Sequence, residues 1–111
     1  PASSNTLAKS AHGISDNLVQ RAAQVTLKER RPLVIAHRES PIGMAEIEAM
    51  RMVTLAGAIV APLSPGFYLE PTSIQNLVDF MAGRLLDLLG VPHDLKIRWD
   101  EHLKARRGPS E

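Results

Sequence analysis

Apolar and polar positions along this chain form blocks that predict helices and strands in turn. Apolar side chains recur at helical spacing from Ser3 to Arg30, with a break expected near Gly13. The runs at residues 33–36 and 58–61 are short and rich in β-branched residues, which is typical of strands buried on both faces. The blocks after these two runs again have helical spacing.

The two later helices have recognisable ends. Ser40 is expected to cap one helix, with Pro41 at its first position and Gly57 at its end. Thr72 or Ser73 is expected to cap the other, which ends at Gly90. The apolar stripe of the first helix is predicted at Met44, Ile47, Met50 and Val53, and that of the second at Ile74, Leu77, Val78, Met81, Leu85 and Leu88. A short amphipathic helix is predicted between Lys96 and Arg106.

Strands that alternate with helices favour an α/β fold with a parallel sheet. Two short strands do not make an independently stable sheet, because three or more are usually needed. We therefore expect the remaining strands to come from missing upstream sequence or from a complementary chain. Residues 92–111 are more polar than the rest of the chain, and we expect them to form a tail.

Composition narrows the classes of protein that remain. Hydrophobic residues make up 44% and charged residues 23% of 111, as in ordinary globular domains. The net charge is +1 and aromatic residues are scarce, which argues against binding nucleic acid. No apolar run approaches the ~20 residues of a membrane helix, and we expect a cytoplasmic protein. Cysteine is absent and the histidines lack metal-binding spacing, so no metal site is expected.

Candidate site residues follow the predicted strands, where ligands bind in open α/β sheets. One strand leads into Arg38 and Glu39, which would otherwise form a surface ion pair at a helix start. The other leads into the loop that contains Tyr68. The segment Ser3–Thr6 begins a helix, and its free backbone N–H groups could bind an anion. The alternative is that these residues only cap the helix.

Three basic residues lie on predicted helix faces that also carry apolar side chains. Arg84 falls in the apolar sector of its helix, where a guanidinium needs a partner or a route to water. Arg21 and Lys28 are seven residues apart and so share one face of the first predicted helix. The simpler explanation of this pair is that both are solvated charges at the edge of an apolar stripe.

Several stretches together carry a family resemblance: PASSNTL at residues 1–7, SDNLVQRAAQVTLKERR at 15–31, RESP at 38–41, PGFY at 65–68 and VDFMAGRLLDLLG at 78–90. In order and spacing, residues 1–91 resemble the carboxyl-terminal part of UbiX-type flavin prenyltransferases. The resemblance implies a Rossmann-like or flavodoxin-like fold that binds FMN and requires no metal. It also implies transfer of a dimethylallyl group from dimethylallyl phosphate to N5 and C6 of reduced FMN.

The resemblance further implies a role for each candidate residue. Ser3, Ser4, Asn5, Thr6 and Arg38 would bind FMN, and Glu39 would assist proton transfer. Tyr68 and Arg84 would bind the substrate phosphate and act in catalysis, and Arg21 and Lys28 would line the phosphate pocket. A homododecamer is typical of the family, and its product serves UbiD-type decarboxylases.

Some positions depart from the usual family pattern. PASSNT stands in place of PCSMKT and is similar to the box of FMN-dependent cysteine decarboxylases, where Asn5 would matter more. Gly66 stands where alanine is common, and Leu69-Glu70 stands where His-Arg is common. Two alternatives therefore stay open: a cysteine decarboxylase-like enzyme, or a non-catalytic flavin-binding subunit of an aromatic-acid decarboxylase system.

Overall fold

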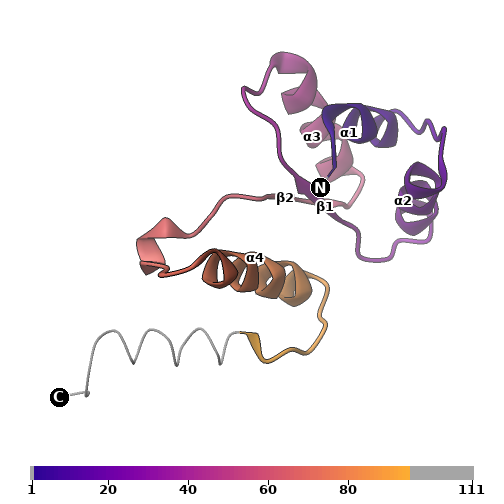
Figure 1. Cartoon of the computed structure of the whole chain (residues 1–111). Helices are drawn as coiled ribbons and strands as arrows, with labels where there is room; N and C mark the ends of the chain where they lie inside the picture. Colours follow the sequence, from indigo (N-terminus) through magenta and orange to yellow (C-terminus); the bar gives the residue numbers. More distant parts are fainter. Residues whose placement is uncertain (1, 96–111) are drawn as a thin grey trace. The chain divides into compact units, whose positions relative to one another are not determined.

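The computed structural model describes residues 2–95, which form two compact units divided between Leu63 and Ser64 (Figure 1). The first unit contains helices α1 (Ser4–Ala11), α2 (Leu18–Lys28) and α3 (Met44–Leu55) and strands β1 (Val34–His37) and β2 (Ile59–Pro62). The second contains a 3-10 turn, η1 (Phe67–Leu69), and helix α4 (Ile74–Leu88). No helix within residues 2–95 is both long and apolar enough to cross a membrane.

The two strands of the first unit are parallel, as the alternation of helix and strand predicts. Val34 pairs with Ile59 and His37 with Pro62, and α3 connects the strands in a βαβ arrangement. On the other edge of β1, Ala2 forms a parallel bridge with His37, and its N–H donates to the carbonyl of Ala36 at 2.6 Å. β1 therefore has a backbone partner on both edges. β2 pairs with one edge, and the segment that leads into α1 pairs with the other.

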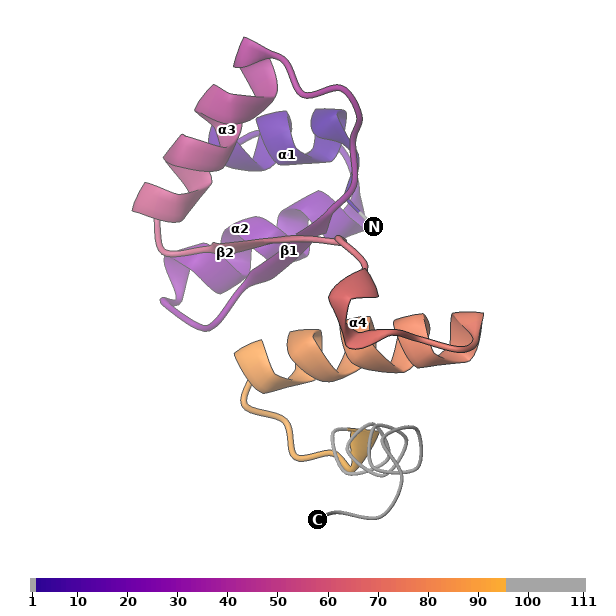
Figure 2. The same ribbon diagram turned by 90° about the vertical axis from the view of Figure 1, so that its left-hand side faces the viewer.

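The core of the first unit lies where α1, α3 and the strands meet. It consists of Leu7, Ile35, Ala49, Val53 and Ala58, all nearly or fully buried. α1 packs against α3, and Figure 2 shows the two helices side by side.

The predicted stripe of α3 was partly wrong, because Met44 and Ile47 are exposed while Ala49 is buried. α1 packs on the face of α3 that carries Ala49 and Val53. Met44 and Ile47 therefore lie on the opposite, exposed side of α3.

The break predicted near Gly13 is confirmed, since α1 ends at Ala11 and α2 begins at Leu18. The predicted cap at Ser40 was wrong, because α3 begins at Met44 with Gly43 as its N-cap. The Gly43 N–H donates to the Glu46 carboxylate at 3.1 Å, which is the half of a capping box that needs no side chain at the N-cap. Both strands begin and end one residue later than predicted, because the ladder extends to His37 and Pro62.

α4 matches its prediction closely. Its N-cap is Ser73, whose hydroxyl accepts a hydrogen bond from the Asn76 N–H at 3.1 Å. The helix stops before Gly90, which adopts the left-handed φ of 71° that favours glycine. Ile74 and Val78 of its predicted apolar stripe are exposed. The helix predicted between Lys96 and Arg106 lies outside the described residues.

Candidate functional site

The start of α1 lies beside the carboxyl end of β1. The Ser4 hydroxyl donates a hydrogen bond to Oε2 of Glu39 at 3.0 Å, although the two residues are 35 positions apart. The backbone bond from Ala2 to Ala36 holds the same two segments together. The structure thus joins two of the candidate segments that the sequence singles out, Ser3–Thr6 and Arg38–Glu39.

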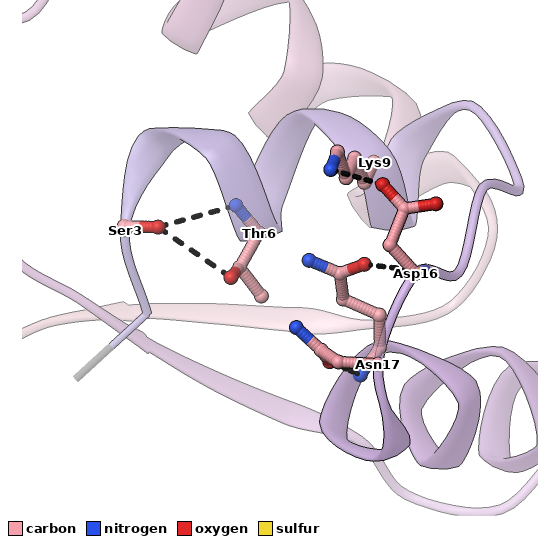
Figure 3. Close-up of polar contacts among 6 residues, drawn as sticks. Ser3, Thr6, Lys9, Asp16 and Asn17 are labelled. Atoms are coloured by element: carbon pink, nitrogen blue, oxygen red, sulfur yellow. Dashed lines mark hydrogen bonds and ion pairs between the residues drawn. The ribbon is translucent and has the colours of Figure 1, made fainter.

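Within the Ser3–Thr6 segment, the four residues have different environments. The Ser3 hydroxyl accepts from the Thr6 N–H at 3.2 Å and donates to the Thr6 hydroxyl at 3.4 Å (Figure 3). Ser3 therefore caps α1, as the simpler alternative predicts. The N–H groups of Ser4 and Asn5 open the helix and have no acceptor within it, so they remain available to an anion.

A second set of contacts fixes the turn between α1 and α2. Lys9 forms an ion pair with Asp16, and the Asp16 N–H donates to the buried Gln20 side chain at 2.8 Å (Figure 3). The Asn17 side chain caps α2 by accepting from the Gln20 N–H at 2.9 Å. These bonds are local, and they join the last turns of α1 to the start of α2 across the break.

Arg38 and Glu39 do not form the surface ion pair that was the alternative reading. Glu39 is held by Ser4, and its second oxygen has no hydrogen-bond partner among residues 2–95. Arg38 is exposed and has no ion-pair partner in the described part of the chain. The site therefore offers one free guanidinium and one half-engaged carboxylate.

His37 is a site feature that the sequence does not single out. It is the last residue of β1 and only 3% exposed, and its Nε2 atom has no hydrogen-bond partner among the described residues. A buried imidazole nitrogen without a partner costs free energy, on the order of 1–3 kcal/mol. This orphaned atom fits a polar ligand bound at the end of β1.

Arg21 and Lys28 are both exposed on α2. In residues 2–63, no hydrogen bond or ion pair joins either side chain to the segment around Ser4 and Glu39. An open cavity of about 520 Å³ lies between α1, α2 and β1, and neither basic residue lines it. Its walls are mostly apolar: Ala2, Thr6, Ser10, Val19, Ala22, Ala23, Thr26, Leu33, Val34, Ile35 and Ala36.

The second unit carries Tyr68 on η1 and Arg84 on α4. Tyr68 is 80% exposed, and the Arg84 side chain is 56% exposed, so the guanidinium reaches water instead of lying on a covered apolar face. One nitrogen of Arg84 lies 3.6 Å from the Asp87 carboxylate. Asp87 is a contact residue that was not predicted from the sequence, although its spacing of three residues from Arg84 is typical of a helical ion pair.

Gly66 explains how η1 packs against α4. It is buried, and a Cβ atom at this position would lie 3.0–3.3 Å from three atoms of the Phe80 ring. Phe80 lies one helical turn before Arg84. The alanine common at this position in the family would therefore push against Phe80 here.

We expect Gly66→Ala to destabilise the protein by about 1 kcal/mol, because Phe80 must move to admit the methyl group. Thermal unfolding of the variant and of wild type measures the difference. Gly66→Ala combined with Phe80→Leu should recover part of the loss, because the smaller side chain removes the contact. An unchanged unfolding temperature in the single variant would show that Phe80 is free to tilt away.

Within residues 2–95, no group of three or more histidine or acidic side chains is placed to hold a metal ion. The donors in the first unit instead consist of hydroxyls, helix N–H groups and the Arg38 guanidinium, which suit phosphate.

The model of the family described as Flavoprotein matches residues 1–86. The chain therefore belongs to the flavoprotein family. Within that family it is similar to the UbiX group, as the sequence motifs predict. It is 46% identical over 101 residues to the flavin prenyltransferase UbiX of Pseudomonas aeruginosa, which covers 91% of this chain and 48% of that protein.

Solved structures agree with this placement and confirm the flavodoxin-like α/β fold. AnUbiX in complex with FMN and dimethylallyl pyrophosphate superimposes with a TM-score of 0.79 at 44% identity, covering 82% of this chain and 48% of that one. A dodecameric FMN-dependent UbiX-like decarboxylase from Escherichia coli O157:H7 also gives 0.79, at 39% identity over 84% of this chain and 50% of that one. The chain thus spans about half the length of the relatives it matches.

Proposed function

We propose that this chain forms part of a flavin prenyltransferase that transfers a dimethylallyl group from dimethylallyl phosphate to reduced FMN. The observation that carries the proposal is the hydrogen bond between Ser4 and Glu39. It brings the predicted flavin segment and the predicted proton-transfer residue together at the carboxyl end of β1, where ligands bind in α/β sheets. The high identity to UbiX relatives supports the same activity.

FMN is the cofactor that we propose for the first unit. The N–H groups of Ser4 and Asn5 and the exposed guanidinium of Arg38 provide donors for its phosphate, and Ser3 and Thr6 shape the start of the helix. The unpartnered Nε2 of His37 adds a polar atom near the same strand end. Reduced FMN would supply the electron-rich ring that accepts the prenyl group.

We propose that Tyr68 and Arg84 bind the phosphate of the allylic substrate. Arg21 and Lys28 would line a phosphate pocket, as the family resemblance implies. Cleavage of the allylic C–O bond leaves a carbocation and a phosphate oxyanion, and a guanidinium and a phenol stabilise the oxyanion as its charge develops. Glu39 would hold a proton released during transfer. Ser4 donates to its Oε2 atom, which leaves Oε1 for that role.

We also propose how the FMN domain is completed and how the protein assembles. Residues 1–91 would form the carboxyl-terminal part of the FMN domain, and the rest of the sheet would come from an upstream half or a complementary chain. A homododecamer is supported by the dodecameric relative. A UbiD-type decarboxylase would receive the product in the cytoplasm.

The test is an anaerobic assay of the full-length protein with reduced FMN and dimethylallyl phosphate, followed by mass spectrometry of the flavin. Formation of prenylated FMN is the expected result. Dimethylallyl pyrophosphate is assayed in parallel, because a related structure contains it. If FMN binds but neither donor is consumed, the non-catalytic flavin-binding alternative replaces this proposal. Decarboxylation of a cysteinyl peptide would instead favour the cysteine decarboxylase.

A further inference from the structure

In the second unit, one carboxylate joins Arg84 to a partly buried histidine. Oδ2 of Asp87 lies 3.6 Å from a guanidinium nitrogen of Arg84, and Oδ1 lies 2.6 Å from Nε2 of His93. The two oxygens of Asp87 therefore have one partner each. The exposed fractions are 43% for the Asp87 side chain and 9% for that of His93, so the histidine is the enclosed end of this chain of contacts.

The hydrogen bonds of His93 assign the roles of its two ring nitrogens. The Leu95 N–H donates to Nδ1 at 3.1 Å, so Nδ1 carries a lone pair and no hydrogen. In that tautomer Nε2 carries the hydrogen and donates it to Asp87. Both ring nitrogens are satisfied, and the carboxylate receives a short hydrogen bond that fixes its orientation.

Gly83 makes room for this arrangement. It is buried in α4 directly before Arg84, and a Cβ atom there would lie 3.3 Å from Cε1 of His93 and 3.5 Å from Cβ of Leu95. Glycine inside a helix costs ~1 kcal/mol relative to alanine. The close approach of the imidazole gives a physical reason for a glycine at this position.

The contact between Asp87 and Arg84 is an ion pair and not a hydrogen bond, because 3.6 Å is too long for one. The carboxylate can therefore attract the guanidinium without occupying its N–H donors. An exposed ion pair of this kind contributes little to stability. A guanidinium that is oriented and still has free donors is suited to bind a phosphate oxyanion.

We infer that Asp87 is a positioning residue for Arg84 and that His93 holds Asp87 in the orientation this requires. The inference rests on the proposed function, in which Arg84 binds the phosphate of the allylic substrate. The competing explanation is that His93 only fastens the segment around Leu95 to α4, through the bond to the Leu95 N–H and the packing on Gly83.

Two substitutions of His93 separate these explanations, because each keeps one of its hydrogen bonds. In His93→Gln the amide nitrogen replaces Nε2 and can still donate to Asp87. In His93→Asn the side-chain oxygen replaces Nδ1 and can still accept from Leu95. Each variant loses one hydrogen bond, so the two are matched for stability.

The assay is prenylation by full-length protein, with kcat and KM for dimethylallyl phosphate measured separately. We expect His93→Asn and Asp87→Asn to lower kcat/KM about 10-fold, mainly through kcat, because a misplaced guanidinium loses transition-state contact. His93→Gln should recover most of this loss. Asp79→Asn is the control, since it removes a carboxylate from the same helix whose partner is Gln75. Equal activity of the two histidine variants, with Asp87→Asn at the level of wild type, would overturn the inference.

Crystal structures of wild type and both histidine variants give a readout that does not depend on activity. The Arg84 guanidinium should keep its place in His93→Gln and move in His93→Asn. A guanidinium that stays in place in His93→Asn would leave His93 as a fastening residue only. Wild-type protein that forms no prenylated FMN would reject the proposed function, while these structures would still decide whether Arg84 is positioned through Asp87.

Discussion

Arg84→Ala should bind FMN as wild type does but lose about 100-fold or more of its prenylation turnover, the scale expected for deleting one electrostatic donor to a developing charge. The contact with the leaving phosphate strengthens as the C–O bond breaks, so its removal lowers kcat more than it raises KM. The structure supports such a role, because Arg84 is more than half exposed and its ion-pair contact with Asp87 leaves guanidinium donors free.

The measurement is the rate of prenylated FMN formation, with FMN occupancy determined by absorbance in the same samples. Arg51→Ala is the matched control, because Arg51 is also an exposed helical arginine paired with an acidic neighbour, Glu48. Tyr68→Phe should lose less than Arg84→Ala, because it removes one neutral donor and keeps the ring. Loss of FMN from Arg84→Ala would make Arg84 a flavin ligand or a structural residue.

Features that depend on local sequence could be predicted well. The start of α4 at Ser73 and its end before Gly90 each rest on a residue whose preference acts within a turn. The two parallel strands were located to within one residue, because a short β-branched run between helices has few other interpretations.

Features that depend on tertiary packing were predicted less well. The predicted cap of α3 was Ser40, but the helix begins at Met44, where the Glu46 side chain accepts a hydrogen bond from the Gly43 N–H. Which face of α3 is buried depended on the approach of α1, and that approach favours Ala49 over Met44 and Ile47. Apolar periodicity identifies a face that can be buried, but only the neighbouring elements decide which residues are.

The candidate site shows the same division. Position along the predicted elements singled out Ser4, Glu39 and Arg84, and the family resemblance implied their roles. The bond between Ser4 and Glu39 spans 35 residues and depends on the fold. The contact of Asp87 with Arg84 lies within α4, where spacing along a helix provides a usable signal. His93 lies beyond the end of α4, so its contact with Asp87 has no such signal. The unpartnered His37 nitrogen has no sequence signal, because burial of a polar group depends on what packs around it.

Arg38→Ala should weaken FMN binding by about 1.5–3 kcal/mol, the range for hydrogen bonds to charged groups. This corresponds to a rise in Kd of about 10- to 150-fold. Arg38 directly follows β1, beside a glutamate already held by Ser4, and has no ion-pair partner within residues 2–95. The Arg38 guanidinium therefore gives up no ion pair when it binds a phosphate. Titration of FMN into apo full-length protein, followed by flavin fluorescence, measures the change.

The salt dependence of this titration separates a direct phosphate contact from a long-range charge effect. Removing a direct contact should leave an affinity deficit that persists at high salt, whereas removing a distant charge should leave one that vanishes with screening. Arg51→Ala again serves as the control, because it removes the same charge from α3 and should leave FMN affinity unchanged. If Arg38→Ala binds FMN with the affinity of wild type, Arg38 is a surface residue. The phosphate must then be held by the start of α1 alone, through the amides of Ser4 and Asn5.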